Sequence, residues 1–214
     1  MRLAKHCGLD VPDTEFRTIL GRDIYLIERF DRRVEGNEFK RIPFASALTM
    51  LEALEIAAHR YSYRDLAEAI RRFGSDPLSD LRELFRRMAF NILVGNDDDH
   101  LRNHAFLFDG RGWRLSPLYD VVSRPHVGSN GRLILAIGDR GHEATLANAL
   151  TGAATYGLDR EEAATLLEDL RVRVNARWKA ALVEAKISEV DIERFAKCFA
   201  EAGKDKWQNG DDGR

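Results

Sequence analysis

Apolar positions recur with helical spacing over most of the chain beyond residue 43. The clearest case follows Asp76 and Pro77, where apolar residues fall three and four positions apart from Leu78 to Ile92. Asp is a favoured N-cap and Pro a favoured first residue of a helix, so this pattern predicts a helix that begins at Pro77. Other helices are predicted at residues 2–7, 43–54, 63–73, 144–156, 160–185 and 188–202.

Shorter segments predict strands. Residues 14–20 and 24–32 flank a turn at Gly21 and form a predicted hairpin, whereas polar residues 33–40 predict a loop. A second hairpin is predicted from residues 105–108 and 112–115 around Asp109-Gly110, and a strand from residues 132–137 after the turn Asn130-Gly131. Together these elements predict an α+β fold, with a small β part followed by a mostly helical part.

Composition narrows the class of protein. With 214 residues, 44% of them hydrophobic and 32% charged, the chain can bury one sizeable core. A net charge of -2 gives no overall attraction to nucleic acid or to anionic membranes. Cys7 and Cys198 lack the spacing of a zinc site or a disulfide framework, and no apolar run approaches the roughly 20 residues that cross a bilayer. The expected location is the cytoplasm, without a membrane partner.

One polar stretch, residues 95–103, interrupts two apolar segments and contains three consecutive acids, Asp97, Asp98 and Asp99. Three carboxylates placed side by side repel one another and lose solvation when they are buried, unless a cation, a helix end or solvent compensates. A solvated acidic loop is one interpretation, and a site for a metal or a phosphate-bearing ligand is the other. Asp97 and Asp99 are expected to face solvent or to bond the loop backbone.

Asp98 is followed five residues later by Asn103, and Asp120 lies seventeen residues beyond that. In protein kinases a loop Asp accepts the proton of the substrate hydroxyl, while an Asn five residues later and a following Asp hold Mg²⁺. Their hard oxygen atoms suit Mg²⁺, and the base must sit beside the metals rather than on them. The spacing alone is met by many sequences, so the surrounding residues decide.

Residues 90–103 and 113–123 resemble the HipA family of bacterial kinases. The first contains a match to that family's D-x-H-x-K-N loop, with Arg102 in place of Lys, and the second a match to its P-x-Y-D turn. The resemblance implies Asp98 as catalytic base, His100 as a catalytic-loop residue that positions the loop, and Asn103 and Asp120 as Mg²⁺ ligands. We therefore expect Asp98, Asn103 and Asp120 to converge in the fold.

Residues 24–32 also resemble the HipA segment R-F-D-R, which ends the small lobe and forms the hinge between lobes. The resemblance implies that the Glu28 carbonyl and the Phe30 amide contact adenine and that Asp31 lies near the ribose of ATP. It implies a protein-kinase-like fold, with residues 1–43 as the end of the small lobe and the hinge, residues 44–203 as the helical large lobe and residues 204–214 as a polar tail.

A complete HipA-like kinase carries, before this region, a phosphate-covering loop and a strand Lys that neutralises the ATP phosphates, and neither is visible in this sequence. Both act in the electrostatic stabilisation of the transition state, so their loss costs several kcal/mol. The chain is therefore expected to be inactive or weak by itself.

Three functions are compatible with these motifs. The first is a serine/threonine protein kinase using ATP and Mg²⁺, the toxin of a toxin-antitoxin pair; by resemblance its partners are a HipB-like helix-turn-helix antitoxin, DNA only through that antitoxin, and a protein substrate such as an aminoacyl-tRNA synthetase. The second is a non-catalytic module that binds the antitoxin. The third is a metal-dependent phosphohydrolase built on Asp97, Asp98, Asp99 and His100.

Overall fold

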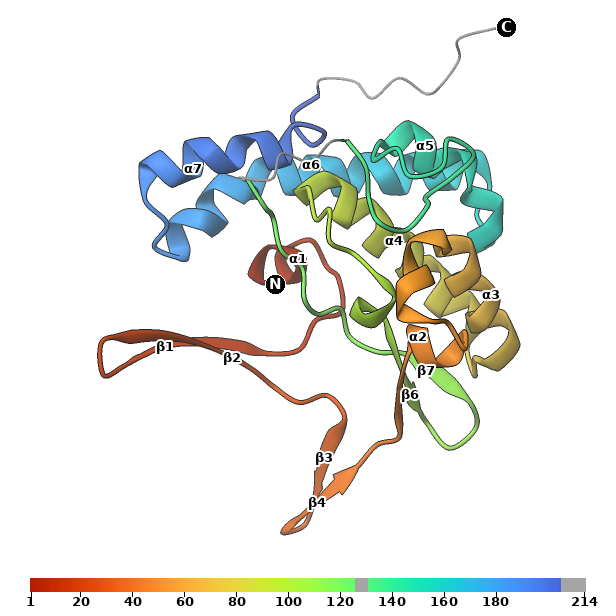
Figure 1. The fold of residues 1–214 in the computed structure, drawn as a ribbon. Helices are drawn as coiled ribbons and strands as arrows, with labels where there is room; N and C mark the ends of the chain where they lie inside the picture. Colours follow the sequence, from red (N-terminus) through yellow and green to blue (C-terminus); the bar gives the residue numbers. More distant parts are fainter. Residues whose placement is uncertain (126–130, 205–214) are drawn as a thin grey trace, which may run out of the picture.

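The structure, a computed structural model, describes residues 1–125 and 131–204. A helical body carries two hairpins that project from it (Figure 1). The α-helices are α1 (Arg2–His6), α2 (Ala47–Met50), α3 (Tyr63–Phe73), α4 (Pro77–Val94), α5 (Leu146–Thr151), α6 (Arg160–Glu184) and α7 (Glu189–Phe195), and the 3-10 helices are η1 (Glu55–Arg60), η2 (Leu101–Asn103), η3 (Ala153–Tyr156) and η4 (Ala196–Phe199). The strands are β1 (Thr14–Ile19), β2 (Arg22–Ile27), β3 (Arg32–Glu35), β4 (Glu38–Arg41), β5 (Phe44–Ser46), β6 (Ala105–Phe108) and β7 (Trp113–Leu115). This mixture of helices and small sheets is the predicted α+β class.

Helix α4 forms the centre of the body, as its apolar pattern predicts. Asp76 caps it by accepting a hydrogen bond from the main-chain N–H of Ser79, and Pro77 takes the first helical position. Leu84 and Phe85 on α4 are fully buried, and the helix packs against α3 and α6. Burial of one such side chain contributes about 1.5–3 kcal/mol, so α4 is the main source of core stability.

The other helix starts also follow from local signals. Ser62 and Asp65 form a capping box at the start of α3, and Asp159 and Glu162 form one at the start of α6. The predicted helix at residues 144–156 is divided into α5 and η3, and the helix predicted after Ser188 is α7 followed by η4. Among the described residues, no helix combines the length and apolar character needed to span a membrane.

The first part of the chain contains two hairpins instead of the predicted hairpin and loop. Strand β2 pairs with β1 and ends at Ile27, not at Arg32. Residues 33–40 were predicted to be a loop, but β3 and β4 pair there around the two-residue turn Gly36-Asn37. Gly36 has a φ of 61°, the left-handed conformation that a tight hairpin turn requires. The local turn signal therefore overrides the polar composition of the segment.

The helix predicted to begin at Pro43 begins later. Residues 44–46 form β5, which pairs with β6, while β6 pairs on its other edge with β7. Without β5, one edge of β6 would leave main-chain hydrogen-bonding groups unpaired inside the body, which is costly. The chain then turns into the short helix α2, which Ser46 caps.

The strand predicted at residues 132–137 is also absent from the described structure. This segment makes isolated bridges only, including one between Ala136 and Ser62. The Ala136 carbonyl accepts a hydrogen bond from the Tyr63 main-chain N–H at 2.9 Å. Its alternating apolar side chains thus pack against the start of α3 without a neighbouring strand. Asn130 of the predicted turn, and residues 205–214 of the predicted tail, lie outside the described residues.

Candidate active site

The candidate catalytic loop starts where α4 ends, at Gly95. This residue has φ 63° and ψ 39°, a left-handed conformation that favours glycine. A Cβ atom at this position would lie 2.9 Å from the carbonyl oxygen of Cys198 on η4. Glycine therefore turns the chain out of α4 and also allows η4 to pack directly against the start of the loop.

Asn103 and Asp120 are in direct contact, although sixteen residues lie between them in the chain. Asn103 Nδ2 donates a hydrogen bond to Asp120 Oδ2 at 2.6 Å, and Asn103 Oδ1 accepts one from the His100 main-chain N–H at 3.1 Å. Asp120 has a φ of 58°, a left-handed conformation that Asp adopts more readily than most residues with a side chain. The structure thus brings together two of the three residues expected to converge.

Asp98 is linked to the same region through Arg124, four residues beyond Asp120. Arg124 Nε lies 2.8 Å from Asp97 Oδ1, and Arg124 Nη2 lies 3.4 Å from Asp98 Oδ1. The hydrogen bond with Asp97 raises the pKa of the Arg124 guanidinium. The Asp98 side chain remains 51% exposed and is accessible to a ligand. Among the described residues, Asp98 is connected to this turn by the arginine and not by a hydrogen bond to Asn103 or Asp120.

The structure corrects the expectation that Asp97 and Asp99 face solvent or bond the loop backbone. Asp99 is buried, where its Oδ2 accepts a hydrogen bond from the Tyr63 hydroxyl and lies 3.0 Å from His104 Nε2. The Asp97 side chain is mostly buried and pairs with Arg124. The expectation was wrong because donors from distant segments compensate the desolvation of these carboxylates.

This arrangement disfavours a phosphohydrolase cluster. Asp99 has partners in the core, whereas Asp97 and Asp98 share Arg124. In residues 1–125 and 131–204, no group of three His, Cys, Asp or Glu side chains is arranged to hold a metal ion. The three consecutive acids therefore do not act as one ligand set.

His100 contacts Asn103 through its main chain. The His100 ring is partly buried, and its Nδ1 atom is enclosed without a hydrogen-bond partner among the described residues. Arg102, which replaces the Lys of the motif, pairs with Glu55 of η1. The loop conformation around Asn103 is thus fixed by the His100 main chain, and the role of the His100 ring stays a prediction.

The three predicted hinge residues occupy different surroundings. The Glu28 main-chain N–H donates to the Asp13 carbonyl at 2.8 Å. The Phe30 ring packs against the ring of Tyr119, with 5.4 Å between centroids, next to Asp120 in the chain. The Asp31 carboxylate pairs with two arginines, Arg29 and Arg32, and these contacts lower its pKa. Phe30 is therefore the hinge residue that connects this segment to the Asp120 turn.

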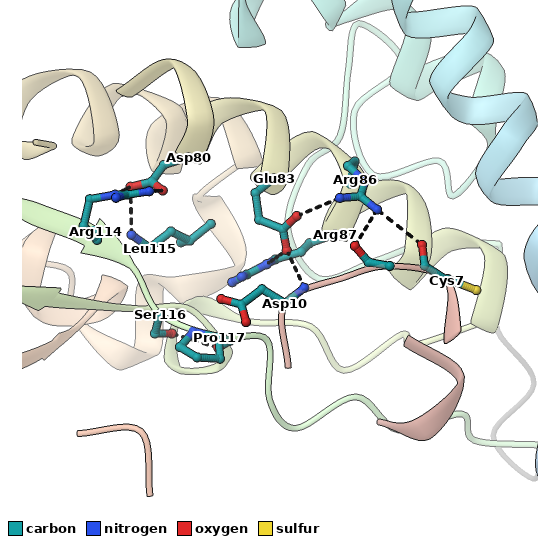
Figure 2. A network of polar contacts seen from close by, with 11 residues as sticks. Cys7, Asp10, Asp80, Glu83, Arg86, Arg87, Arg114, Leu115, Ser116 and Pro117 are labelled. Atoms are coloured by element: carbon teal, nitrogen blue, oxygen red, sulfur yellow. Dashed lines mark hydrogen bonds and ion pairs between the residues drawn. The ribbon is translucent and has the colours of Figure 1, made fainter. Parts of the chain in front are cut away.

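The acidic side chains of α4 hold the segment that leads to Asp120 (Figure 2). Asp80 is buried and accepts hydrogen bonds from Arg114 Nη2 at 3.0 Å and from the Leu115 main-chain N–H at 2.9 Å. Arg114 Nε also donates to Asp80 at 3.0 Å, so the guanidinium makes a bidentate contact that fixes geometry as well as charge. The end of β7 is thereby attached to the central helix.

One turn later, Glu83 connects α4 to the amino-terminal segment, as Figure 2 also shows. Glu83 Oε1 accepts from Arg87 Nε at 2.9 Å and from the Asp10 main-chain N–H at 3.4 Å. The Asp10 carbonyl in turn accepts from the Leu118 main-chain N–H at 2.8 Å. Arg87 is 2% exposed, so Glu83 compensates a buried charge. The same helix thus orients both the amino-terminal segment and the residues just before Asp120.

Sequence reasoning missed Tyr63, His104 and Arg124 as residues of this region. Burial, together with the nearby Asp99 carboxylate, raises the pKa of Tyr63 well above its usual value, so its hydroxyl stays protonated and can donate. Nothing in the sequence around Tyr63 or His104 links either residue to Asp99, because the three come together only in the folded core. Arg124 carried a weak signal, as a basic residue close after the Asp120 motif.

The ligand types at Asn103 and Asp120 fit Mg²⁺. Mg²⁺ prefers oxygen ligands and is commonly held by one or two carboxylates together with substrate phosphates and water. Asp120 supplies a carboxylate, and Asn103 can supply its amide oxygen if that atom turns from the His100 main chain toward the ion. Neither side chain is committed to another cation in the described structure.

Comparisons with known proteins agree with this geometry. The model of the HipA-like C-terminal domain matches residues 1–178. A provisionally named kinase of Sinorhizobium fredii, Y4mE, is 34% identical over 128 residues, which are 58% of this chain and 30% of that protein. The serine/threonine-protein kinase toxin HipA of Shewanella oneidensis is 27% identical over 140 residues, 58% of this chain and 32% of that protein. The matched segment thus spans about a third of these curated relatives.

Two solved structures share the fold. The chain superimposes with a TM-score of 0.75 on HipA from the Shewanella oneidensis complex of HipA, HipB and operator DNA, at 22% identity, covering 94% of this chain and 53% of that one. It superimposes with a TM-score of 0.64 on the Helicobacter pylori proinflammatory kinase CtkA, at 16% identity, covering 94% and 79%. The chain therefore belongs to the HipA-like C-terminal domain family and has the kinase-like fold of these proteins.

Proposed function

We propose that this chain is the large-lobe part of a HipA-like serine/threonine protein kinase that transfers the γ-phosphoryl group of ATP to a protein hydroxyl. The observation that carries the proposal is the 2.6 Å contact between Asn103 and Asp120, from two motifs that a hairpin separates. Asp98, with its exposed carboxylate, is tied to the same turn by Arg124. A loop carboxylate beside an Asn and an Asp is the constellation of phosphoryl transfer.

In this proposal the residues have distinct tasks. Mg²⁺ would neutralise the charge that develops on the transferred phosphoryl group. Asn103 and Asp120 would bind the ion, and Asp98 would orient the substrate hydroxyl and accept its proton. His100 would maintain the loop. The Glu28 carbonyl and Phe30 amide would bind adenine, with Asp31 near the ribose.

The domain organisation and the partners belong to the same proposal. Residues 1–43 would complete the small lobe and the hinge, residues 44–203 would form the large lobe, and residues 204–214 would form a tail. Phosphoryl transfer would need a phosphate-covering loop and a small-lobe Lys in addition to these residues. We further propose a cytoplasmic toxin whose partner is a helix-turn-helix antitoxin, with DNA contacted through the antitoxin; HipA of Shewanella oneidensis is seen with HipB and operator DNA. The substrate would be a protein, with aminoacyl-tRNA synthetases as the first to test.

The test separates the base from the metal ligand. The chain is combined with a polypeptide that carries the small lobe, and transfer from radiolabelled ATP and binding of Mg²⁺-ATP by calorimetry are measured. We expect Asp98→Asn to lower transfer by about 10²–10⁴-fold with little change in nucleotide affinity. Asp120→Asn should lower both. Asp169→Asn, an exposed acid on α6 that pairs with Arg173, is the matched control and should change neither.

Three outcomes would each contradict part of the proposal. Equal loss of nucleotide affinity in Asp98→Asn and Asp120→Asn would remove the basis for calling Asp98 the base. Capture of the antitoxin without any nucleotide binding or transfer would favour the non-catalytic module. Robust transfer by this chain alone would show that its own residues replace the small-lobe Lys.

A further inference from the structure

A continuous chain of buried side chains connects the two candidate ligand segments through the core. It begins at the Val122 main-chain N–H, which donates to Asn96 Oδ1 at 3.4 Å, and continues from Asn96 Nδ2 to Asn91 Oδ1 at 3.1 Å. Asn91 Nδ2 donates to the Tyr63 hydroxyl oxygen at 3.1 Å. From Tyr63 the chain passes to Asp99 and from Asp99 to His104, as described above. We call these five side chains, Asn96, Asn91, Tyr63, Asp99 and His104, the buried relay.

The two ends of the buried relay fall beside the candidate metal ligands. Val122 is two residues from Asp120, and His104 directly follows Asn103. Both ends have a second attachment: the Ser123 hydroxyl donates to the Val94 carbonyl at 2.7 Å, and the His104 carbonyl accepts from the Ala47 main-chain N–H at 2.8 Å. Displacement at either end would therefore be transmitted to a ligand.

Tyr63 is the junction of the buried relay. Its hydroxyl is fully buried, accepts from Asn91 on α4 and donates to Asp99 in the loop, so a single atom joins a rigid helix to the candidate catalytic loop. Buried polar groups stabilise a structure when every member is paired, and an unpaired member is costly. Five polar side chains at the centre of a core are an expensive way to obtain stability alone, because apolar side chains of the same size would pack there at lower cost.

We propose that the buried relay sets the position of Asn103 relative to Asp120 and that Tyr63 is its principal positioning residue. The metal-dependent half of this inference, that the buried relay affects metal binding, rests on the proposed function. The structural half, that the buried relay holds the two segments together, does not. Residues behind metal ligands orient them, and their loss commonly weakens metal binding about 10–100-fold. Tyr63 touches neither ligand and acts only through Asn96, Asn91, Asp99 and His104.

The decisive variant is Tyr63→Phe, which removes one oxygen atom and retains the ring. Tyr156→Phe is a closely matched control, because Tyr156 is also buried, and among the described residues the one hydrogen bond of its hydroxyl goes to the Met88 sulfur, at 3.6 Å. Amide hydrogen exchange followed by mass spectrometry measures the exchange rates of residues 96–104 and 120–125. The exchange rate of α6 serves as the internal reference for global opening.

We expect Tyr63→Phe to accelerate exchange at least about tenfold in both segments relative to α6, because the variant loses both buried hydrogen bonds of the hydroxyl, the one from Asn91 and the one to Asp99. Tyr156→Phe should leave the exchange rates of these two segments unchanged relative to the exchange rate of α6. Acceleration that is uniform over the molecule, or confined to one of the two segments, would overturn the inference. If Tyr63→Phe does not fold, Asn96→Ser interrupts the buried relay at its Val122 end. Faster exchange of both segments relative to α6 would then support the inference, and uniform or one-sided acceleration would overturn it.

A second readout tests the metal-dependent half. Mn²⁺ binding in the presence of ATP, followed by electron paramagnetic resonance with the small-lobe polypeptide present, should weaken about tenfold in Tyr63→Phe and remain unchanged in Tyr156→Phe. Unchanged Mn²⁺ affinity in Tyr63→Phe would refute this half. Absence of Mn²⁺ binding in the unsubstituted protein would refute the proposed function instead, while the exchange experiment would still decide whether the buried relay holds the two segments together.

Discussion

The two amino-terminal hairpins and the helical body are built in different ways. In the body, α4 buries Leu84 and Phe85 completely, whereas in the hairpins Phe39 is 78% exposed and Val34 is 65% exposed. The projecting strands are thus held mainly by their own ladders, and a two-stranded hairpin alone is marginally stable in water. The difference teaches that the side of the candidate site with Asn103 and Asp120 is built into the body, while the predicted hinge residues 28–31 lie between two exposed hairpins.

The largest expected effect tests the difference in core packing between the helical body and the hairpins. Phe85→Ala should lower the free energy of unfolding by about 3–5 kcal/mol because it leaves a cavity beneath α4. Phe39→Ala should change it by less than about 0.5 kcal/mol, because that ring is exposed. Urea unfolding followed by circular dichroism measures both. Similar losses for the two variants would mean that β4 is packed against the body in solution.

The next effect concerns ion pairs. Glu83→Ala should cost about 3 kcal/mol, because it leaves the buried Arg87 without its partner and frees the Asp10 main chain. Its counterpart in the hairpins is Glu15→Ala, which breaks an exposed pair with Arg17 and should change the free energy of unfolding little, because solvent screens such a pair. The same unfolding measurement applies, repeated in high salt. A Glu83 effect that vanishes in salt would contradict its buried role.

The smallest expected effect concerns a hairpin turn within the helical body. Asp109, in the turn between β6 and β7, accepts hydrogen bonds from Ser75 and from two main-chain N–H groups, and these lower its pKa from 3.8 to about 2. A lowered native pKa stabilises the fold above about pH 4, and this stabilisation disappears as the pH falls toward 2. Thermal unfolding of Asp109→Asn should therefore differ from that of the unsubstituted protein near pH 7, and the difference should shrink below about pH 4 and be nearly gone near pH 2. A constant difference would exclude the charge as its source.

Much of the body could be predicted because its signals are local. The predicted Asp76 cap marks the start of α4, and the structure confirms it. The helix starts predicted at residues 63 and 160 are also present, where Ser62 and Asp159 are the caps. Two of the failures have non-local causes. Residues 44–46 become β5 only because β6 offers an edge, and residues 132–137 lack a strand partner.

The candidate site divides in the same way. The contact of Asn103 with Asp120 was expected from two linked motifs and is present, whereas the part of Asp98 in catalysis stays a prediction. Burial of Asp99 could not be anticipated, since its partner Tyr63 lies 36 residues away in the chain. Neighbouring acids in a sequence do not reveal which of them finds a donor in the core.

The contact between Gly95 and Cys198 limits how this chain can vary through evolution. Position 95 must satisfy two independent demands, a left-handed backbone and empty space toward a carbonyl oxygen. Asn or Asp could meet the first demand at modest cost, but any side chain violates the second. Trimming the side chain of Cys198 would not compensate, because the obstructing atom belongs to the main chain. The start of the candidate catalytic loop and the helix η4 must therefore change together, so a homologue that lacks glycine here should also carry a displaced carboxy-terminal helix.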